Sequence, residues 1–205
     1  MTDGRADGRT TRWAGHREQR RAAFVAAAVD VIERVGPQAT VDQIAGELDV
    51  TRQALYRQFD DRADLDAAIA LEAADQLVAA VLPHLDLSGD IATSVRSGLL
   101  AYVGYVEQHL SLYRFVRAHE ASGAVERAKD SLRSKVAAVA RDYLVATGTA
   151  DPAVAEVFAT GVIGMADAVV GRWLDNPGAM TRAAMVDNLV QMVLGVIATV
   201  VPQAP

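Results

Sequence analysis

Residues 39–59, ATVDQIAGELDVTRQALYRQF, contain two short helical segments separated by a tight turn. The first segment follows Thr40, whose hydroxyl can accept a hydrogen bond from the Gln43 amide while the Gln43 side chain reaches back, an arrangement known as a capping box. Thr51 is a favourable N-cap for the second segment. The spacing predicts a helix-turn-helix whose second helix can enter the major groove of DNA.

The second segment carries long hydrogen-bond donors on the face left outward when Leu55 and Phe59 point inward. Arginine is suited to guanine and glutamine to adenine, and arginine or tyrosine also reaches phosphate oxygens. The outward residues are Arg52, Gln53, Tyr56 and Arg57. The alternative is an ordinary helical hairpin with a solvated face. The gathering of long donors on so short a helix favours DNA recognition.

The rest of the chain predicts helices, because apolar residues recur every three to four positions and strand-like alternation is missing. The first helix is expected over about 17–35, where Gly36 and Pro37 end it. Asp61 and Asp151 are predicted N-caps of later helices. The helices expected after the helix-turn-helix cover about 61–82, 90–110, 112–119, 123–146, 152–173 and 181–200. The predicted fold class is therefore all-α.

Composition limits the kinds of function that the chain can have. Of its 205 residues 51% are hydrophobic and none is cysteine, so disulfides, thiolate metal sites and a cysteine nucleophile are excluded. Residues 1–21 hold six arginines and three acidic residues, whereas the whole chain has a net charge of −6. This distribution argues against indiscriminate coating of nucleic acid. The N-terminus lacks a signal-peptide pattern, and the most apolar stretch, 189–201, is too short to span a bilayer. We expect a cytoplasmic protein without membrane contact.

Residues 39–65 resemble the N-terminal DNA-binding domain of the TetR family of repressors. The resemblance is carried by Thr40-Val41, Ile44-Ala45, Val50-Thr51, Leu55-Tyr56, Phe59, Arg62 and Leu65. The segment 171–177, GRWLDNP, also looks like the family's junction between its last two helices. The resemblance implies an N-terminal three-helix helix-turn-helix domain and a C-terminal helical ligand-binding and dimerisation domain. We expect a flexible arm over 1–15, the DNA-binding domain over 16–62 and the ligand-binding and dimerisation domain over 63–205.

The resemblance also assigns DNA contacts position by position. The residues assigned to phosphates are Thr40, Thr51, Tyr56 and Arg62. Those assigned to bases are Arg52, Gln53 and Arg57. Two departures bear on this contact map: Asp49 stands where the family usually has glycine in the turn, and Ala54 stands where a hydroxyl residue is frequent. Because aspartate tolerates a left-handed backbone less well than glycine, the turn is expected to be slightly strained or differently shaped.

The last two helices are unusually apolar. Along the final helix a stripe with a spacing close to 3.5 residues is formed by Met185, Leu189, Met192, Val196 and Val200. Burial within one subunit is the simple explanation of such a stripe. In the TetR family, however, the corresponding helices of two subunits form a four-helix bundle. The resemblance therefore implies a homodimer, and two DNA-binding domains related by a two-fold axis suit a palindromic operator in double-stranded DNA.

The middle helices mix polar and aromatic residues with apolar ones. Tyr102, Tyr105 and His109 are spaced to share one helix face, and Asp167 is a carboxylate that would be costly to bury unpaired. The candidate ligand-binding residues are Tyr102, Tyr105, His109, Tyr113, His119, Tyr143 and Asp167. Local hydrogen bonds within the core or an interface would explain each of them equally well. The resemblance implies that some of them line a pocket for a small-molecule effector.

Two other functions, an enzyme and a helical carrier, are alternatives to a DNA-binding regulator. The run Asp60-Asp61-Arg62-Ala63-Asp64 is similar to the aspartate-rich pattern with which isoprenoid enzymes hold magnesium, but it straddles a helix start and no second such run faces it. Zinc-protease and glycine-rich phosphate-loop patterns are missing, so no catalytic residue, metal or cofactor is expected. The second alternative is a helical carrier that has lost DNA binding. The sequence favours a ligand-responsive transcriptional regulator, a repressor released from its operator by a small molecule.

Overall fold

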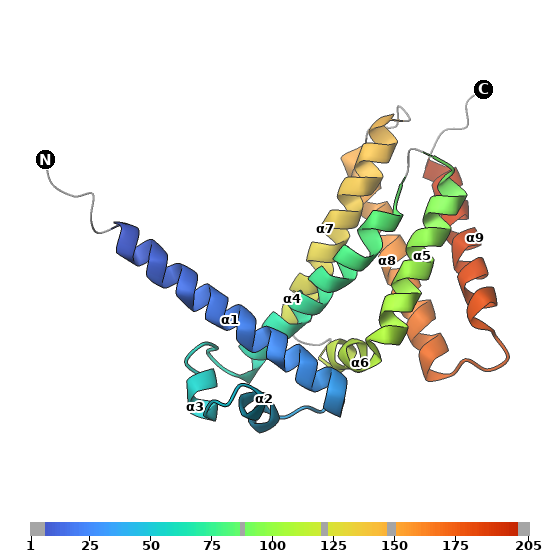
Figure 1. Cartoon of the computed structure of the whole chain (residues 1–205). Helices are drawn as coiled ribbons and strands as arrows, with labels where there is room; N and C mark the ends of the chain where they lie inside the picture. The colour runs from blue at the N-terminus through green and yellow to red at the C-terminus, as the bar shows by residue number, and fades with distance from the viewer. Residues whose placement is uncertain (1–6, 87–88, 120–122, 147–150, 201–205) are drawn as a thin grey trace, which may run out of the picture. The chain divides into compact units, whose positions relative to one another are not determined.

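The computed structural model describes residues 7–86, 89–119, 123–146 and 151–200, and all regular structure within these ranges is helical (Figure 1). The predicted all-α class is confirmed. The α-helices are α1 (Asp7–Val35), α2 (Val41–Glu47), α3 (Arg52–Leu55), α4 (Arg62–Val81), α5 (Ile91–Gln108), α6 (Leu110–Ala118), α7 (Gly123–Ala146), α8 (Pro152–Asp175) and α9 (Arg182–Val200). A 3₁₀ turn, η1 (Leu82–His84), follows α4.

The chain divides into two compact units. The head unit comprises Met1–Ala73 and His109–Ala128, and the body unit comprises Ala74–Gln108 and Lys129–Pro205. The helix-turn-helix and α6 thus belong to the head unit, and α4 runs from one unit into the other after Ala73. The domain bounds expected from the sequence divide the chain by function, whereas these units divide it by packing. The functional bounds remain a prediction.

The head unit is built around one apolar core where α1, α2, α3, α4 and α6 meet. Phe24 of α1 packs edge to face against Phe59, with ring centroids 6.4 Å apart. Phe115 of α6 is completely buried in the same core. The other large, almost fully buried side chains of this core are Val31, Ile32, Ile44, Leu55, Leu65, Ile69 and Leu112. Since each such side chain contributes about 1.5–3 kcal/mol on burial, this core is what fixes the short helices α2 and α3 in place.

The first helix is longer than expected. It begins at Asp7 rather than near Arg17, so residues 7–15 of the expected arm are helical, and 1–6 lie outside the described residues. The expectation followed the apolar residues, which begin at Phe24, but a polar segment without proline can extend a helix that is already nucleated. The C-terminal end is as predicted: Gly36 has φ +104°, and its N–H donates to the Ile32 carbonyl at 2.9 Å.

The body unit is held together mainly by contacts of α9 with α5 and α8 (Figure 1). The α9 residues Met185, Leu189 and Val193 are buried, as are Val103 and Val106 of α5. Two ion pairs then join α5 to α9: Arg96 with Asp187 at 2.5 Å, and Glu107 with Arg182 at 2.9 Å. The predicted stripe on α9 is therefore only partly internal, because Met192 and Val196 remain 47% and 40% exposed.

The helix break predicted between residues 110 and 112 lies two residues earlier in the structure. Helix α5 ends at Gln108, and His109 adopts φ −114° and ψ 43° as the residue that precedes α6. The prediction that Tyr102, Tyr105 and His109 share one helix face was therefore wrong, because the periodicity of α5 stops before His109. Instead the His109 ring lies 2.9 Å from the Glu33 carboxylate of α1.

Candidate DNA-binding site

The predicted helix-turn-helix is present, with both of its predicted caps. The Thr40 hydroxyl accepts from the Gln43 N–H at 3.3 Å, and the Gln43 side chain accepts from the Thr40 N–H at 2.8 Å, which completes the capping box. The Thr51 hydroxyl accepts from the Ala54 N–H at 3.2 Å and caps α3. Both threonines are exposed, so their methyl and hydroxyl groups lie at the surface that would meet a phosphate backbone.

The turn between α2 and α3 has a left-handed residue, as the family pattern requires. Asp49 has φ +51°, which makes it the single non-glycine residue with positive φ within the described ranges. Its N–H donates to Gly46, and the N–H of Val50 donates to Ala45, which is the hydrogen-bond pattern of a Schellman motif. Aspartate therefore occupies the left-handed position of this motif, where glycine is usual, at the cost of placing a Cβ in an unfavourable backbone region.

The recognition segment is shorter and less exposed than predicted. Regular helix ends at Leu55, and a turn continues the chain to the buried Phe59. Three of the four outward residues are exposed as expected, namely Arg52, Gln53 and Arg57. The fourth, Tyr56, is half-buried, and it packs against the head core. The apolar ring is stabilised by this packing.

Arg52 has loose partners in the free protein. Its guanidinium lies 3.6 Å from the Asp42 carboxylate and 5.7 Å from the centre of the Tyr56 ring. The side chains of Arg52 and Asp42 are 59% and 73% exposed, so this ion pair is worth little, about 0–1 kcal/mol. Arg52 can therefore leave Asp42 for a base edge at small cost.

Arg62 is committed to contacts inside the head unit. Its Nε donates to Asp66 at 2.7 Å, and its Nη2 donates to the Ala39 carbonyl at 3.4 Å. The side chain is 36% exposed. The phosphate contact that the resemblance assigns to Arg62 thus has part of the guanidinium left for it. The Asp66 pair has the i,i+4 spacing of a helix, whereas the contact with Ala39, 23 residues earlier, could not be predicted from the sequence.

One residue that was not predicted from the sequence, Arg21, fixes the end of the recognition segment. Arg21 of α1 donates to both carboxylate oxygens of Asp64, at 3.1 and 2.7 Å, and to the Gln58 carbonyl at 2.6 Å. Its guanidinium also lies 4.3 Å from the centre of the Phe59 ring. The hydrogen bond from Arg21, with a smaller contribution from the Asp60 N–H, lowers the pKa of Asp64, and the same bond raises the pKa of Arg21. This bidentate pair could not be predicted from the sequence, because its two residues are 43 positions apart.

The aspartate-rich run, residues 60–64, forms structural contacts within the head unit. An oxygen of Asp61 accepts from the Asp64 N–H at 2.8 Å, so Asp61 is the N-cap of α4 as predicted. Asp64 is held by Arg21, and it also accepts from the Asp60 N–H at 3.1 Å. Asp61 thus caps α4 and Asp64 forms an ion pair with Arg21. A structural role of this kind was the interpretation preferred to magnesium binding in the sequence analysis above.

Two of the candidate ligand residues come together in the body unit. The Tyr102 hydroxyl of α5 lies 3.5 Å from the half-buried Asp167 carboxylate of α8. The Tyr105 hydroxyl lies 3.3 Å from the Gln76 side-chain oxygen of α4. Tyr143 of α7 is half-buried.

The other three candidates belong to the head unit. His109 faces Glu33, and the Tyr113 hydroxyl accepts from Arg117 at 3.4 Å. His119 at the end of α6 lies against Phe115 and Asp66. The seven candidates are thus divided between the units, and Tyr102 and Asp167 are two of them that contact each other.

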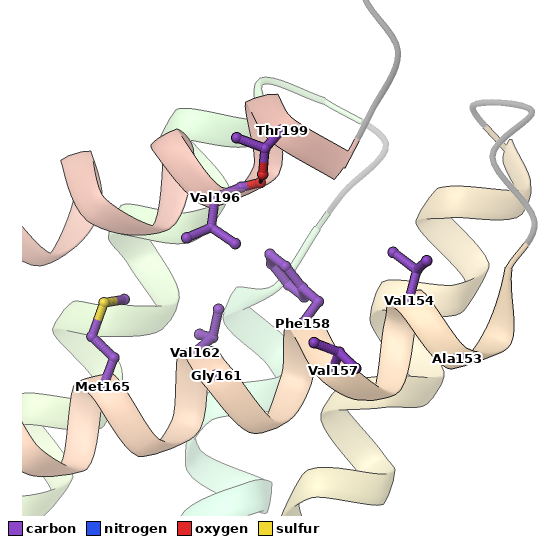
Figure 2. Close-up of a pocket in the computed structure, with 9 residues that line it drawn as sticks. All are labelled: Ala153, Val154, Val157, Phe158, Gly161, Val162, Met165, Val196 and Thr199. Atoms are coloured by element: carbon purple, nitrogen blue, oxygen red, sulfur yellow. Dashed lines mark hydrogen bonds between the residues drawn. The ribbon is translucent and has the colours of Figure 1, made fainter.

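The body unit also has an apolar groove between α8 and α9 (Figure 2). Its volume is about 540 Å³. The side chains around it include Val154, Val157, Phe158, Met165, Val196 and Thr199. None of the seven candidate ligand residues lines this groove. By length and composition alone α8 and α9 are also long and apolar enough to cross a membrane.

Comparison with known proteins relates the head unit to a family of regulators. Residues 24–69, which span the core of α1, the helix-turn-helix and the start of α4, match the family described as bacterial regulatory proteins, tetR family. An uncharacterized HTH-type transcriptional regulator of Mycobacterium tuberculosis (strain ATCC 25618 / H37Rv) is 27% identical over 191 residues, which cover 92% of this chain and 81% of that one. The HTH-type transcriptional activator FasR of Mycolicibacterium smegmatis is 24% identical over 186 residues, covering 87% and 83% of the two chains.

A solved structure extends the likeness of fold to the body unit. The crystal structure of a tetR-family transcriptional regulator from Streptomyces coelicolor superposes with a TM-score of 0.71 at 22% identity, covering 89% of this chain and 82% of that one. Because the relatives that this chain matches over most of their length are transcriptional regulators, the apolar length of α8 and α9 does not indicate a membrane protein. The matched domain, its capped helix-turn-helix and the relatives aligned over most of their length lead to one conclusion: this chain carries the DNA-binding domain of the TetR family and is a DNA-binding transcriptional regulator.

Proposed function

We propose that this regulator binds a palindromic operator as a homodimer and releases it when a small molecule binds the body unit. The observation that carries the proposal is the recognition segment, where Arg52, Gln53 and Arg57 are exposed on a segment fixed by the head core. Arginine and glutamine are the side chains that pair bidentately with guanine and adenine. Around them we place phosphate contacts at Thr40, Thr51, Tyr56 and, through its remaining N–H groups, Arg62.

The groove between α8 and α9 supports the dimer. Val157 is 74% exposed, and Met192 and Val196 are also exposed, although all three are apolar. A side chain added at Gly161 or Gly164 would meet no atom of this chain, so the backbone of α8 is open to close approach by another surface. Large apolar patches on a soluble protein usually mark an interface. A second copy of the chain is the occupant that the family suggests, and a two-fold dimer carries two head units to one palindrome.

The contact between Tyr102 and Asp167 supports an effector site in the body unit. A half-buried carboxylate beside a tyrosine hydroxyl gives a small number of polar groups among apolar helices, which is the usual composition of a ligand pocket. Changing Asp167 to Asn should alter the response to effector and leave operator affinity within about twofold, since the head unit is unchanged. An unchanged effector response would assign Asp167 to structure alone.

Release from DNA follows from the continuity of α4. This helix begins in the head unit beside the recognition segment and ends in the body unit, so a ligand that shifts its body part also moves the recognition helices of a dimer out of register. Recognition helices must sit about one DNA turn, roughly 34 Å, apart. A coupling of about 1–3 kcal/mol is enough to empty a modestly occupied operator. We place the protein in the cytoplasm, with its DNA.

The proposal is tested by selection of random double-stranded DNA with the purified full chain, followed by sequencing of the retained duplexes. We expect an enriched palindrome whose half-sites are centred about one helical turn apart. The matched control is the Arg52→Ala, Gln53→Ala double variant, which should lose the enrichment. Selection of a single, non-repeated site would overturn the dimeric part of the proposal. An absence of enrichment at low salt, where phosphate attraction is strongest, would overturn operator binding itself.

A further inference from the structure

The recognition segment is too short to hold its own shape. Its regular helix comprises Arg52–Leu55, and Arg57 follows on a turn that continues to the buried Phe59. A helix of this length is not stable alone, because the cost of nucleation is not recovered. A side chain that pairs with a base edge must be held within about 0.5 Å of its productive position. The position of Arg57 is therefore set by groups outside the segment.

Arg21 of α1 and Asp64 of α4 hold the backbone on both sides of Phe59. Arg21 Nη1 donates to the Gln58 carbonyl at 2.6 Å, and the Asp60 N–H donates to Asp64 Oδ2 at 3.1 Å. Arg21 and Asp64 are joined to each other by two further hydrogen bonds, at 3.1 and 2.7 Å. We call this pair, with its two backbone contacts, the Arg21 clamp. It ties the end of the recognition segment to both α1 and α4.

The clamp depends on the shape of the guanidinium group. Nη1 of Arg21 contacts both the Gln58 carbonyl and one oxygen of Asp64, while Nη2 contacts the other oxygen. Arginine presents its donors in a rigid planar fork, whereas a lysine ammonium is a point charge on a flexible stem. The hydrogen bond between the two side chains lowers the pKa of Asp64 and raises that of Arg21, so both stay charged near neutral pH.

The Arg21 side chain is engaged within the head unit. It is 29% exposed, whereas the Arg52 side chain is 59% exposed. The guanidinium also lies 4.3 Å from the centre of the Phe59 ring. A phosphate would have to compete with a carboxylate that already accepts two hydrogen bonds from this group, and bidentate pairs of this kind are among the stronger polar contacts. The geometry therefore favours an indirect contribution of Arg21 to DNA binding.

We propose that Arg21 is a positioning residue for base reading: the Arg21 clamp fixes the backbone beside Arg57 and thereby sets how well the protein distinguishes its operator from other sequences. The proposal rests on operator binding by the head unit, as proposed above. Gln58, whose carbonyl Arg21 holds, directly follows Arg57. Attraction to phosphates is independent of base sequence and does not need this geometry. Loss of the clamp therefore weakens binding to the operator much more than binding to unrelated DNA.

The first test measures affinity for two duplexes of equal length, the palindrome enriched from the random pool and a scrambled sequence. Arg21→Gln should weaken binding to the palindrome by roughly tenfold or more, as expected for the loss of one well-placed base contact. The matched control is Arg20→Gln, which removes the same charge from the neighbouring exposed position and should affect the two duplexes by equal factors. Equal factors for the two duplexes in Arg21→Gln as well would overturn the proposal.

A conservative variant separates the shape of the guanidinium from its charge. Arg21→Lys keeps the positive charge but cannot hold the carbonyl and both carboxylate oxygens in one plane. It should lose discrimination between the two duplexes nearly as fully as Arg21→Gln does. Discrimination by Arg21→Lys equal to that of the unaltered chain would show that charge alone is sufficient, and this result would overturn the clamp.

The partner carboxylate gives a test with the opposite sign. Asp64→Asn removes a negative charge from the head unit, so electrostatic attraction alone predicts tighter binding to any DNA. The clamp instead predicts weaker binding to the palindrome, because Arg21 loses the group that orients it. Asp30→Asn, which changes an exposed carboxylate in the middle of α1, is the control and should not weaken binding. Tighter or unchanged binding of the palindrome by Asp64→Asn would contradict the proposal.

Folding is separated from positioning by the ratio of the two affinities. Partial unfolding lowers the concentration of competent protein, so it weakens binding to both duplexes by the same factor and leaves their ratio unchanged. A reduced ratio in Arg21→Gln supports positioning, whereas an unchanged ratio with a lower melting temperature assigns Arg21 to stability alone. If no duplex is enriched, operator reading fails and the positioning role fails with it.

The clamp itself is measured without DNA. Nitrogen-resolved NMR spectra of the arginine side chains in the full chain should show separate Nη signals for Arg21, because hydrogen bonds to two partners slow the rotation of its guanidinium. The exposed Arg20 is the internal control and should give averaged signals. In Asp64→Asn the Arg21 signals should move toward the average. Averaged Arg21 signals in the unaltered chain would overturn the clamp, even if an operator is found.

Discussion

Arg52 is an exposed arginine whose surroundings leave it ready to contact a base. Its pair with Asp42 at 3.6 Å is solvent-exposed and weak, so little is lost when the guanidinium moves to guanine. Changing Arg52 to Ala should weaken binding to the selected operator by about 1–3 kcal/mol and relax the base preference at one position of each half-site. Titration of labelled duplex measures both effects.

Two controls sharpen this prediction. Arg34 is also exposed but pairs with Glu47, away from the recognition segment, and Arg34→Ala should change the affinity much less. Asp42→Asn should instead raise the affinity, since it frees Arg52 and removes a negative charge from the DNA-facing side. Unchanged affinity in Arg52→Ala would remove Arg52 from the set of base-reading residues.

Asp64 gives the head unit a stability that depends on pH. Its pKa is lowered chiefly by the hydrogen bond from Arg21, so the folded carboxyl stays ionised to lower pH than it does in the unfolded chain. The stabilisation is present above the unfolded value of about 3.9 and is lost as the pH falls through the folded one. Asp64→Asn should lower the free energy of unfolding at pH 7 by about 1 kcal/mol and should lose less stability than the unaltered chain between pH 5 and 3.

Thermal unfolding followed by circular dichroism across this pH range checks the Asp64 prediction. Asp30, exposed in the middle of α1, provides the matched control, and Asp30→Asn should leave the acid side of the curve unchanged. An Asp64→Asn variant with the full acid sensitivity of the unaltered chain would show that the Arg21 pair does not set it.

At the scale of single helices, the local signals in the sequence were sufficient for most of the fold. Thr40, Thr51, Asp61 and Asp151 each cap the helix for which they were predicted. Such caps are readable because donor and acceptor lie two or three residues apart, and the apolar periodicity then says which face is inward.

The contacts that could not be predicted from the sequence join residues that are far apart in the chain. Arg62 is held by Ala39, 23 positions earlier, and Arg21 by Asp64, 43 positions later. The position of the break between α5 and α6, predicted at 110–112 and observed at His109, has no sharp local signal either, because no glycine or proline lies between Tyr105 and Ala118. For the same reason the predicted ligand residues included three that belong to the head unit: their polarity was visible, but not the helix on which they pack.

The turn between α2 and α3 carries a testable cost. Asp49 has φ +51°, where a Cβ is unfavourable and glycine is not. Asp49→Gly should stabilise the chain by about 0.5–1 kcal/mol, and Asp49→Ala, which lacks even the polar side chain that tolerates this region, should destabilise it. Urea unfolding of the unaltered chain and the two variants measures these differences in the free energy of unfolding. Destabilisation by glycine would mean that the aspartate side chain contributes a contact larger than its backbone strain.

At the scale of the whole molecule, the apolar groove of the body unit predicts the oligomeric state. Val157 is 74% exposed beside this groove, and a charge there would be buried unpaired in a dimer. Val157→Glu should therefore yield monomers by light scattering and weaken operator binding at least tenfold. Val145→Glu changes a valine that is 57% exposed on α7, outside the groove, and should remain dimeric. A Val157→Glu protein that is still dimeric would place the interface elsewhere.

The central claim is that this chain reads a specific DNA sequence through its head unit. The most direct measurement compares its affinity for the selected palindromic duplex with that for a scrambled duplex of equal length and composition, in about 150 mM salt. The account predicts a preference of roughly 10³-fold or more, the range typical of specific regulators. Equal affinity for the two duplexes would contradict this claim. The arginines of the recognition segment would then contribute electrostatic attraction to DNA, and neither they nor the glutamine would distinguish one base sequence from another.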